Sequence, residues 1–344
     1  MSQTKVENRQ PADVLNWILD RAMIILIILL AIVVAILRPA FIRIPSIVNL
    51  LCLTAARLPM ALGVAGCIVL AGTDLSGGRV AGLTGFISAI LLQSAGTATR
   101  FLQGGQPLPV PLVILIAMVV GGTIGVVNGF CMGKFKLHPF IVTLATQLIT
   151  YGVYLTVSNS KQVSSLDPSY STNFVIKPLF EFTVGGIRTV VPMYVLLAII
   201  LTAIMWVVWN KTAFGKNMFA VGSNEEAARV SGVNVLFTIV VTFIIAGALY
   251  GYTGFIEAAR IGTSGPSLGL SYENDAISAV VIGGVSFVGG TGKISGVILG
   301  VFMMQLIIAS MTFLGISGSI TYIIKGGVIL IACILDMRKY RTKK

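Results

Sequence analysis

The sequence has few charged side chains. Charged residues make up 10% of its 344 residues and hydrophobic residues 56%, whereas a typical soluble domain is about 25% charged. A water-soluble protein of this length needs more polar surface than this to stay dispersed. The composition therefore argues against an ordinary soluble protein and predicts a chain that lies in a membrane.

Residues with catalytic or metal-binding chemistry are also scarce. The one histidine, His138, precedes Pro139 at the edge of an apolar segment and is interpreted as an interfacial residue. No Gly-x-Ser-x-Gly or His-Glu-x-x-His motif occurs, and glycine-rich residues 283–292 lack the spacing of a phosphate-binding loop. The four cysteines lie in apolar segments and match no metal or disulfide pattern. We expect no catalytic residue, metal or cofactor in this chain.

Long apolar runs are what the sequence has instead. From Ala22 to Leu37 no side chain is polar, and Arg21 and Arg38 flank the run. At 1.5 Å per residue the run is about 24 Å long, close to the thickness of the bilayer hydrocarbon. Because no small-residue cleavage site precedes the next charge, the run is interpreted as a retained membrane span and not as a signal peptide.

Windows of about 17–25 apolar residues predict about ten membrane segments. The segments are 18–37, 49–71, 79–95, 108–131, 139–157, 190–209, 237–258, 274–290, 293–313 and 318–335. The fold class is therefore predicted to be all-α, a polytopic membrane helix bundle that forms one transmembrane domain over residues 1–344. The segment 274–290 is short and rich in glycine, which favours a broken or re-entrant helix there.

The distribution of basic residues predicts the orientation. The net charge is +12, and about fifteen Lys and Arg fall on one side of the predicted segments against about seven on the other. The positive-inside rule then places both termini in the cytoplasm, loop 158–189 outside and loop 210–236 inside. Because the charge excess fits this rule, we expect no nucleic-acid partner.

The loop 210–236 contains a short segment with the signals of a capped helix. Ser223 and Glu226 have the spacing of a capping box, and Asn224 is an alternative cap. Glu225 falls with Glu226 in the first turn, which suits the helix dipole, and Gly232 is a natural stop. The segment predicts a helix of about eight residues, too short and too polar to span a bilayer.

Spacing alone leaves two interpretations of this helix open. It could be a rigid peg that docks on a motor protein, or a surface helix that only joins two spans. In the first interpretation the coupling residues are Gly222, Ser223, Asn224, Glu225, Glu226, Ala227, Ala228 and Gly232.

The pattern Glu-Ala-Ala-x-x-x-Gly at residues 226–232 resembles the coupling motif of ABC importer permeases. The Ile-x-Leu-Pro that follows it in maltose-type permeases is absent, and residues 222–232 (GSNEEAARVSG) resemble the ribose/galactose branch instead. Residues 72–78 (GTDLSGG), 139–144 (PFIVTL) and 283–292 (GGVSFVGGTG) resemble that branch too, in order along nearly the whole chain. Residues 62–66 (LGVAG), 214–217 (FGKN) and 258–262 (AARIG) look most like permeases of galactose/methyl-galactoside importers.

The resemblance implies a non-catalytic permease of the cell (inner) membrane that works as a homodimer. It implies a cytoplasmic ABC ATPase, which binds ATP and Mg²⁺, and an external sugar-binding protein. ATP-driven closure of the ATPases would then move the coupling helices. The implied substrate is a monosaccharide such as galactose, methyl galactoside or glucose, with ribose, xylose or a nucleoside as alternatives.

An ion-coupled secondary transporter is the alternative of another class. Such transporters carry coupling carboxylates in mid-helix, whereas the acidic residues here lie at segment ends and in loops. A membrane-embedded enzyme is disfavoured by the absence of catalytic motifs.

Polar residues at membrane depth are candidates for a translocation pathway. Asp74 and Ser76 lie in a glycine-rich break between two segments, where transporters expose backbone to substrate. Asp74 could bond sugar hydroxyls, or it could cap the next helix and pair with Arg79; the two interpretations stay open. Further pathway candidates, for which helix–helix hydrogen bonding is the alternative, are Asn128, Thr143, Thr146 and Gln147.

Charged residues in or near the segments are candidates as well. Glu257 and Arg260 are three residues apart on one helical face and could neutralise each other or line an outer gate. Asp275, in the acidic stretch 273–275, could cap a helix or contact sugar or binding protein. Arg57 and Lys325 fall within segments and must either reach the headgroups or find a carboxylate.

Overall fold

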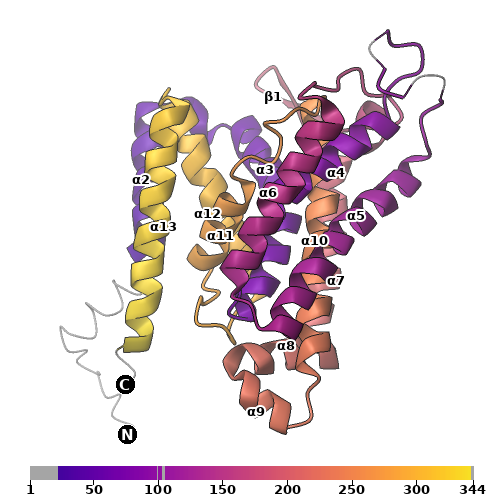
Figure 1. Cartoon of the computed structure of the whole chain (residues 1–344). Helices are drawn as coiled ribbons and strands as arrows, with labels where there is room; N and C mark the ends of the chain where they lie inside the picture. The colour runs from indigo at the N-terminus through magenta and orange to yellow at the C-terminus, as the bar shows by residue number, and fades with distance from the viewer. Residues whose placement is uncertain (1–21, 99, 103–104, 342–344) are drawn as a thin grey trace, which may run out of the picture.

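The computed structural model describes residues 22–98, 100–102 and 105–341, and these form a bundle of helices (Figure 1). A two-stranded hairpin lies at one end of the bundle and helices α8 and α9 at the other, here called the hairpin end and the α9 end. The α-helices are α2 (Ala22–Leu37), α3 (Ile44–Val69), α4 (Gly77–Leu91), α5 (Val110–Phe135), α6 (Pro139–Ser158), α7 (Met193–Lys211), α8 (Ala213–Ser223), α9 (Glu225–Val230), α10 (Val235–Ile261), α11 (Tyr272–Ile282), α12 (Ile294–Phe313) and α13 (Gly318–Arg341). Short turns of helix, η1 (Pro39–Ile42) and η2 (Ser171–Val175), and strands β1 (Pro178–Val184) and β2 (Ile187–Pro192) complete the described elements.

Each predicted membrane segment overlaps a helix in the described residues, although the ends of several segments are not helical. Residues 18–21 of the first segment lie outside the described residues. Six helices, α3, α5, α6, α7, α10 and α12, are long and apolar enough to cross a membrane, and α2, α4 and α13 contain shorter apolar stretches. The prediction of a polytopic helical membrane bundle is therefore confirmed.

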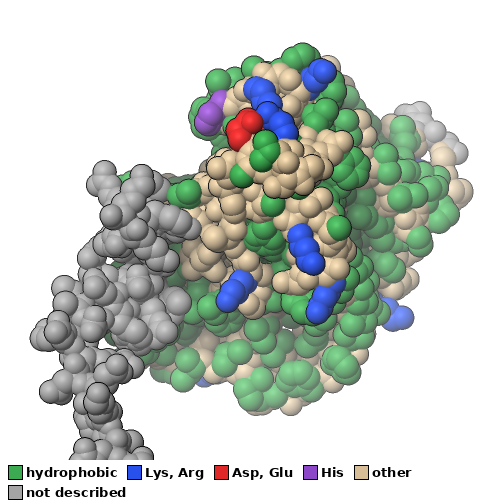
Figure 2. Space-filling view, turned by 90° about the horizontal axis from the view of Figure 1, so that it is seen from below, with side chains coloured by type: hydrophobic (Ala, Val, Ile, Leu, Met, Phe, Trp, Pro, Cys, Tyr) green, Lys and Arg blue, Asp and Glu red, His purple; other side chains and the backbone are tan. Residues whose placement is uncertain are grey.

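The surface of the bundle is apolar along its sides. In the apolar windows of α5, α6 and α7 only 28%, 22% and 28% of residues are buried, against 67% in α3 and 61% in α10. Large side chains on the exposed faces include Leu148 (65% exposed) and Ile149 (66%) of α6. Seen from the α9 end, green apolar side chains surround the rim, and Lys and Arg are scattered across the end itself (Figure 2). This distribution suits a chain whose sides contact lipid.

The hairpin in loop 158–189 shows that the all-α prediction is incomplete. Strands β1 and β2 pair antiparallel, and Gly185 and Gly186 join them with positive φ angles of 58° and 77°. Such a two-residue turn suits the twist of a hairpin. Arg188 bonds Glu181 across the pair at 2.6 Å and holds the pKa of the Glu181 carboxyl below its ordinary value. Strand β2 also occupies the start of predicted segment 190–209, so that helix α7 begins only at Met193.

Two helices are shorter than a membrane span because the chain breaks beside them. The eleven-residue α11 ends at Ile282, earlier than the predicted segment 274–290, and non-helical residues 283–293 follow. The fifteen-residue α4 starts after non-helical residues 70–76. The starts of α4 and α11 meet, since a Cβ on Gly78 would lie 1.8 Å from Glu273 Oε2 and 2.4 Å from the Gly269 carbonyl oxygen.

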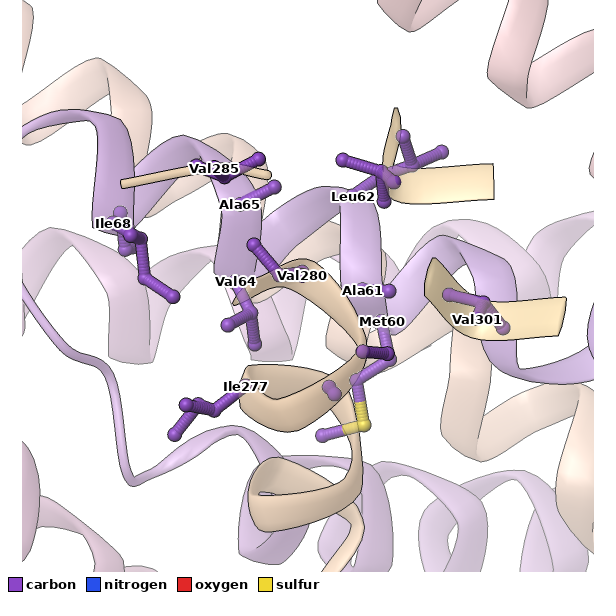
Figure 3. Close-up of a cluster of buried hydrophobic side chains, with 14 of the residues drawn as sticks. Met60, Ala61, Leu62, Val64, Ala65, Ile68, Ile277, Val280, Val285 and Val301 are labelled. Atoms are coloured by element: carbon purple, nitrogen blue, oxygen red, sulfur yellow. The ribbon is translucent and has the colours of Figure 1, made fainter. Parts of the chain in front are cut away.

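The core of the bundle lies where α3 packs against α11 and α12. Met60, Val64 and Ile68 of α3 are at most 1% exposed and belong to one cluster with Ile277 and Val280 of α11 (Figure 3). Lipid tails are as apolar as these side chains, so in a bilayer their contribution comes from close van der Waals packing and not from removal of water. The fit between α3 and α11 therefore depends on shape.

Helices α5 and α10 approach each other through glycine. A Cβ at Gly121 would lie 2.1 Å from the Gly247 carbonyl oxygen, and one at Gly125 would lie 2.0 Å from that of Phe243. Because the two glycines are four residues apart, they share one face of α5. Gly283, the first of the glycine-rich residues 283–292, packs in the same way against the carbonyl oxygen of Gly296.

Replacing Gly125 with alanine should force α5 and α10 apart. Overpacking of this kind costs about 1–3 kcal/mol, so the melting temperature of the detergent-purified protein should fall by several degrees. Gly152→Ala on α6 is the matched control, because nothing lies within 4 Å of its added Cβ and alanine favours a helix over glycine by about 1 kcal/mol. Equal melting temperatures for the two variants would contradict close packing at Gly125.

Candidate functional site

Helix α9 forms where the capped segment was predicted, but with a different cap. The Asn224 side chain accepts a hydrogen bond from the Ala227 N–H at 2.9 Å, so Asn224 is the N-cap. Ser223 is instead the last residue of α8, where its hydroxyl donates to the Phe219 carbonyl oxygen at 2.9 Å. The predicted Ser223–Glu226 capping box is therefore wrong. Helix α9 has six residues, and Gly232, with φ of 85°, follows its end as expected.

One face of α9 is exposed at the end of the bundle. Val230 is 86% exposed and Glu226 76%, and Ala227 between them is exposed as well. Ala228 on the opposite face is only 4% exposed and packs into the main core cluster. The exposed face therefore offers a small apolar and acidic surface.

Ion pairs hold α9 in place. Arg229 bonds Glu225 at 2.7 Å and Glu226 at 3.0 Å, and Lys136, just after α5, bonds Glu225. These groups are partly exposed, so each pair contributes little alone. Together with the Asn224 cap they fix the orientation of α9 against the end of α5.

Gly222 lies in α8, where it contacts the membrane helices and not the exposed face of α9. A Cβ on Gly222 would lie 1.8 Å from the carbonyl oxygen of Val69, the last residue of α3. The same carbonyl accepts the N–H of Gly290 at 2.8 Å. Gly289, with φ of 89°, lies against the Gly222 carbonyl oxygen. Helix α8 thus touches both the end of α3 and the loop before α12 through backbone atoms, here called the glycine junction.

Most of the predicted pathway residues bond to one another inside the bundle. The Ser76 hydroxyl donates to Asp74 Oδ1 at 2.6 Å and accepts from Asn128 Nδ2 at 3.0 Å. The Thr146 hydroxyl donates to Asn128 Oδ1 at 2.6 Å, and the Thr143 hydroxyl lies 3.2 Å from the Thr73 carbonyl oxygen. Asp74, Ser76 and Asn128 are each 1% exposed. This chain of bonds joins the 70–76 break to α5 and α6.

Asp74 bonds Ser76, the residue just before α4. Its carboxylate accepts the Ser76 N–H at 2.9 Å, in addition to the hydroxyl. Arg79 bonds elsewhere, to the Pro266 carbonyl oxygen at 3.3 Å, and its guanidinium lies 3.9 Å from the centre of the Tyr151 ring. The N-cap residue of α4 is Ser76, without a side-chain cap bond, so capping of α4 by Asp74 is not confirmed. The Arg79 pair that accompanied this interpretation is not formed among the described residues, and a contact of Asp74 with sugar stays a prediction.

The predicted charged residues form ion pairs. Glu257, 0% exposed, pairs with Arg260 at 2.7 Å and with Arg57 at 3.7 Å, and it accepts the Tyr272 hydroxyl at 3.3 Å. Arg57 therefore pairs with a carboxylate, which was one of the two alternatives predicted for it. The buried charges therefore compensate each other. Removing one partner would leave the other charge unpaired in a low-dielectric environment.

Asp275 pairs with Lys325 of α13 at 2.9 Å. Lys325 thus also finds a carboxylate, and the pair connects the first turn of α11 to the last described helix. Whether Glu257, Arg260 and Asp275 line a pathway stays a prediction.

Gln147 and Glu273 form a contact that the sequence did not predict. Gln147 Nε2 donates to Glu273 Oε1 at 3.3 Å, which joins α6 to the first turn of α11. Glu273 is 5% exposed, and its Oε2 has no hydrogen-bond partner among the described residues. The acidic stretch 273–275 was a signal for a site, but its partner on α6 could not be read from the sequence. In the described part of the chain, no three His, Cys, Asp or Glu residues are grouped as a metal site.

The sequence of the chain is similar to those of known transport proteins. Residues 46–333 match the family model described as branched-chain amino acid transport system, permease component. The chain is 40% identical to a galactose/methyl galactoside import permease protein of Salmonella typhimurium, over 96% of this chain and 97% of the relative. A protein with the same description from Escherichia coli is 41% identical, over 93% and 94% of the two chains.

A ribose import permease protein of Bacillus subtilis is 34% identical, over 90% of each chain. No solved structure matches. Because the family model covers most of the chain and these relatives align over nearly their whole length, the chain belongs to the permease-component family of branched-chain amino acid transport systems.

Proposed function

We propose that the chain is the transmembrane permease subunit of an ATP-binding-cassette importer that carries galactose or methyl galactoside. The observation that carries the proposal is the near full-length similarity to galactose/methyl galactoside import permeases, at 40–41% identity. The ribose import permease at 34% identity supports the same class of transporter with a different sugar. In this proposal the chain is non-catalytic, and ATP and Mg²⁺ bind to a separate ATPase.

The proposed topology has about ten membrane segments, with α4 and α11 as half-length segments beside breaks in the chain. Both termini and α9 lie in the cytoplasm and the hairpin lies outside, in the inner membrane of the cell. The basic residues exposed at the α9 end support this orientation, among them Lys136, Lys216, Arg229 and Lys293. The working unit is a homodimer that receives sugar from an external binding protein.

Helix α9 is the proposed contact with the ATPase. Its exposed Val230, Ala227 and Glu226 offer an apolar and acidic surface, which suits a groove with basic edges. The ion pairs and the cap make α9 rigid, so displacement of α9 moves α8 as well. Helix α8 then acts on α3 and on the loop before α12 through the glycine junction. Gly222 serves this transmission and not the docking itself, while Asp74, Ser76, Asn128 and Thr143 keep the 70–76 break in shape.

Placing a charge on the exposed face of α9 should uncouple the permease. Val230→Asp should lower sugar uptake by more than about tenfold, because a desolvated carboxylate in an apolar contact costs several kcal/mol. Uptake of radiolabelled galactose, permease content of the membrane and co-purification of the ATPase are the measurements. Val230→Ile is the matched control and should keep uptake and ATPase binding.

Glu226→Lys should lower sugar uptake in the same way, because it reverses the charge of the exposed face. Glu226→Gln is its matched control and should keep uptake and ATPase binding. Full uptake by both Val230→Asp and Glu226→Lys would exclude α9 as the docking element.

The sugar can be identified from ATP turnover. In proteoliposomes with the ATPase, ATP hydrolysis should rise several-fold when galactose-loaded binding protein is added, because loading favours the ATP-closed state. Ribose-loaded binding protein of a ribose importer is the control and should leave the rate unchanged. Stimulation by the ribose-loaded protein alone would overturn the assignment of galactose.

A further inference from the structure

A cluster of polar side chains at the meeting point of α4, α6 and α11 is not accounted for by the coupling helix or by the ion pairs. It consists of Arg79 of α4, Gln147 and Tyr151 of α6, and Glu273 of α11, and is called the central polar cluster. Arg79 stacks on the Tyr151 ring at 3.9 Å, and Gln147 bonds Glu273 at 3.3 Å. Gln147 and Tyr151 are one turn apart, so the two contacts share one face of α6.

The cluster lies at the middle of the membrane-spanning region. Gln147 and Tyr151 fall near the centre of the twenty-residue α6, whose bounds are Pro139–Ser158. Arg79 and Glu273 each lie in the first turn of a half-length helix. The cluster is therefore about one half-length helix away from either end of the bundle.

The cluster is also open to the surroundings of the chain. Arg79, Gln147 and Tyr151 are half-buried, and Asn274, which follows Glu273 in the chain, is exposed. On the same helix α6, Leu148 is 65% exposed among apolar neighbours. A guanidinium and amides facing hydrocarbon would be costly, and charged groups at this depth face water-filled paths or other protein. The surface at the cluster therefore differs from the lipid-facing surface beside it.

Glu273 supplies a hydrogen-bond acceptor that the chain leaves unused. The carboxylate is 5% exposed, and its Oε1 accepts from Gln147. Its Oε2 lies against Gly78 of α4 and has no hydrogen-bond partner among the described residues. An unpaired buried acceptor is costly, and a hydroxyl donor would satisfy it. Asp74 differs in this respect, because Ser76 already donates to it twice.

The chemistry of the set matches a sugar. Carboxylate and amide oxygens accept hydrogen bonds from hydroxyls, while the guanidinium and amide nitrogens donate to hydroxyl oxygens. The Tyr151 ring offers an apolar surface for the C–H face of a pyranose. We propose that the central polar cluster is a contact site for sugar hydroxyls halfway along the translocation path, with Glu273 and Gln147 as its principal contacts; this inference rests on the proposed sugar-importer function.

Deoxy sugars test the contact directly. Proteoliposomes containing the permease, the ATPase and the binding protein would be assayed for uptake of galactose and of its singly deoxygenated analogues. In the wild type, the analogue lacking the contacted hydroxyl should be carried roughly tenfold more slowly than galactose, the effect of one hydrogen bond to a charged group. Glu273→Gln and Gln147→Ala should reduce that difference toward onefold at the same hydroxyl.

A purely structural role predicts another result. Ser88→Ala is the matched control, because Ser88 is a buried residue of α4 that bonds only the Thr84 carbonyl oxygen of its own helix. It should preserve the wild-type preference for galactose over each analogue. Variants at Glu273 and Gln147 that slow all sugars by the same factor would overturn the contact site. Absence of galactose uptake by the wild type would instead count against the proposed function.

Thiol labelling tests whether the cluster faces water. In the assembled complex, Asn274→Cys should react with a charged, membrane-impermeant thiol reagent, and galactose-loaded binding protein with ATP should change its rate of labelling. Leu148→Cys, on the lipid-facing side of α6, should not react. The wild-type chain gives the background labelling of Cys131 and Cys333, which are both half-buried. Equal reactivity of the two variants, or no reaction at Asn274→Cys, would overturn the proposal.

Discussion

Every backbone polar group of a chain in hydrocarbon must find a partner within the protein, and this constraint shapes the whole molecule. Helices satisfy it along their length, but the breaks at 70–76, 262–271 and 283–293 do not do so alone. Asp74 supplies acceptors at the first break, Ser264 pairs with Val163 at the second, and the Gly290 N–H bonds Val69 at the third. Bonds to neighbouring segments thus supply partners to backbone groups that the breaks leave without helical ones.

The same constraint divides the polar side chains into two groups. Asp74, Asn128 and Glu257 are nearly or fully buried and bonded to other side chains, so they hold helices together. Arg79 and Gln147 are half-buried, so part of each side chain lies at the surface of the chain. Residue type alone does not separate these groups, because both contain charges and amides.

The helix positions could be predicted from the sequence because span length is a direct requirement of bilayer thickness. Residues 274–290 were a weaker case, since glycine permits both a helix and a break, and α11 ends at Ile282. The capping box failed because Ser223 and Asn224 are adjacent and either can cap; packing of α8 decides between them. The Gln147–Glu273 contact joins residues 126 positions apart, and no local pattern encodes such a pair. The hairpin was missed although Gly185-Gly186 between strand-forming residues is a recognised signal.

The meeting of the α4 and α11 starts has a consequence for the energy profile of a crossing solute. Helices of fifteen and eleven residues are about 22 and 16 Å long, each less than the full hydrocarbon thickness. A polar molecule that reaches their junction has already passed half of the insulating layer and has a second, separate half before it. The chain thus presents such a molecule with two thin barriers in series in place of one thick barrier.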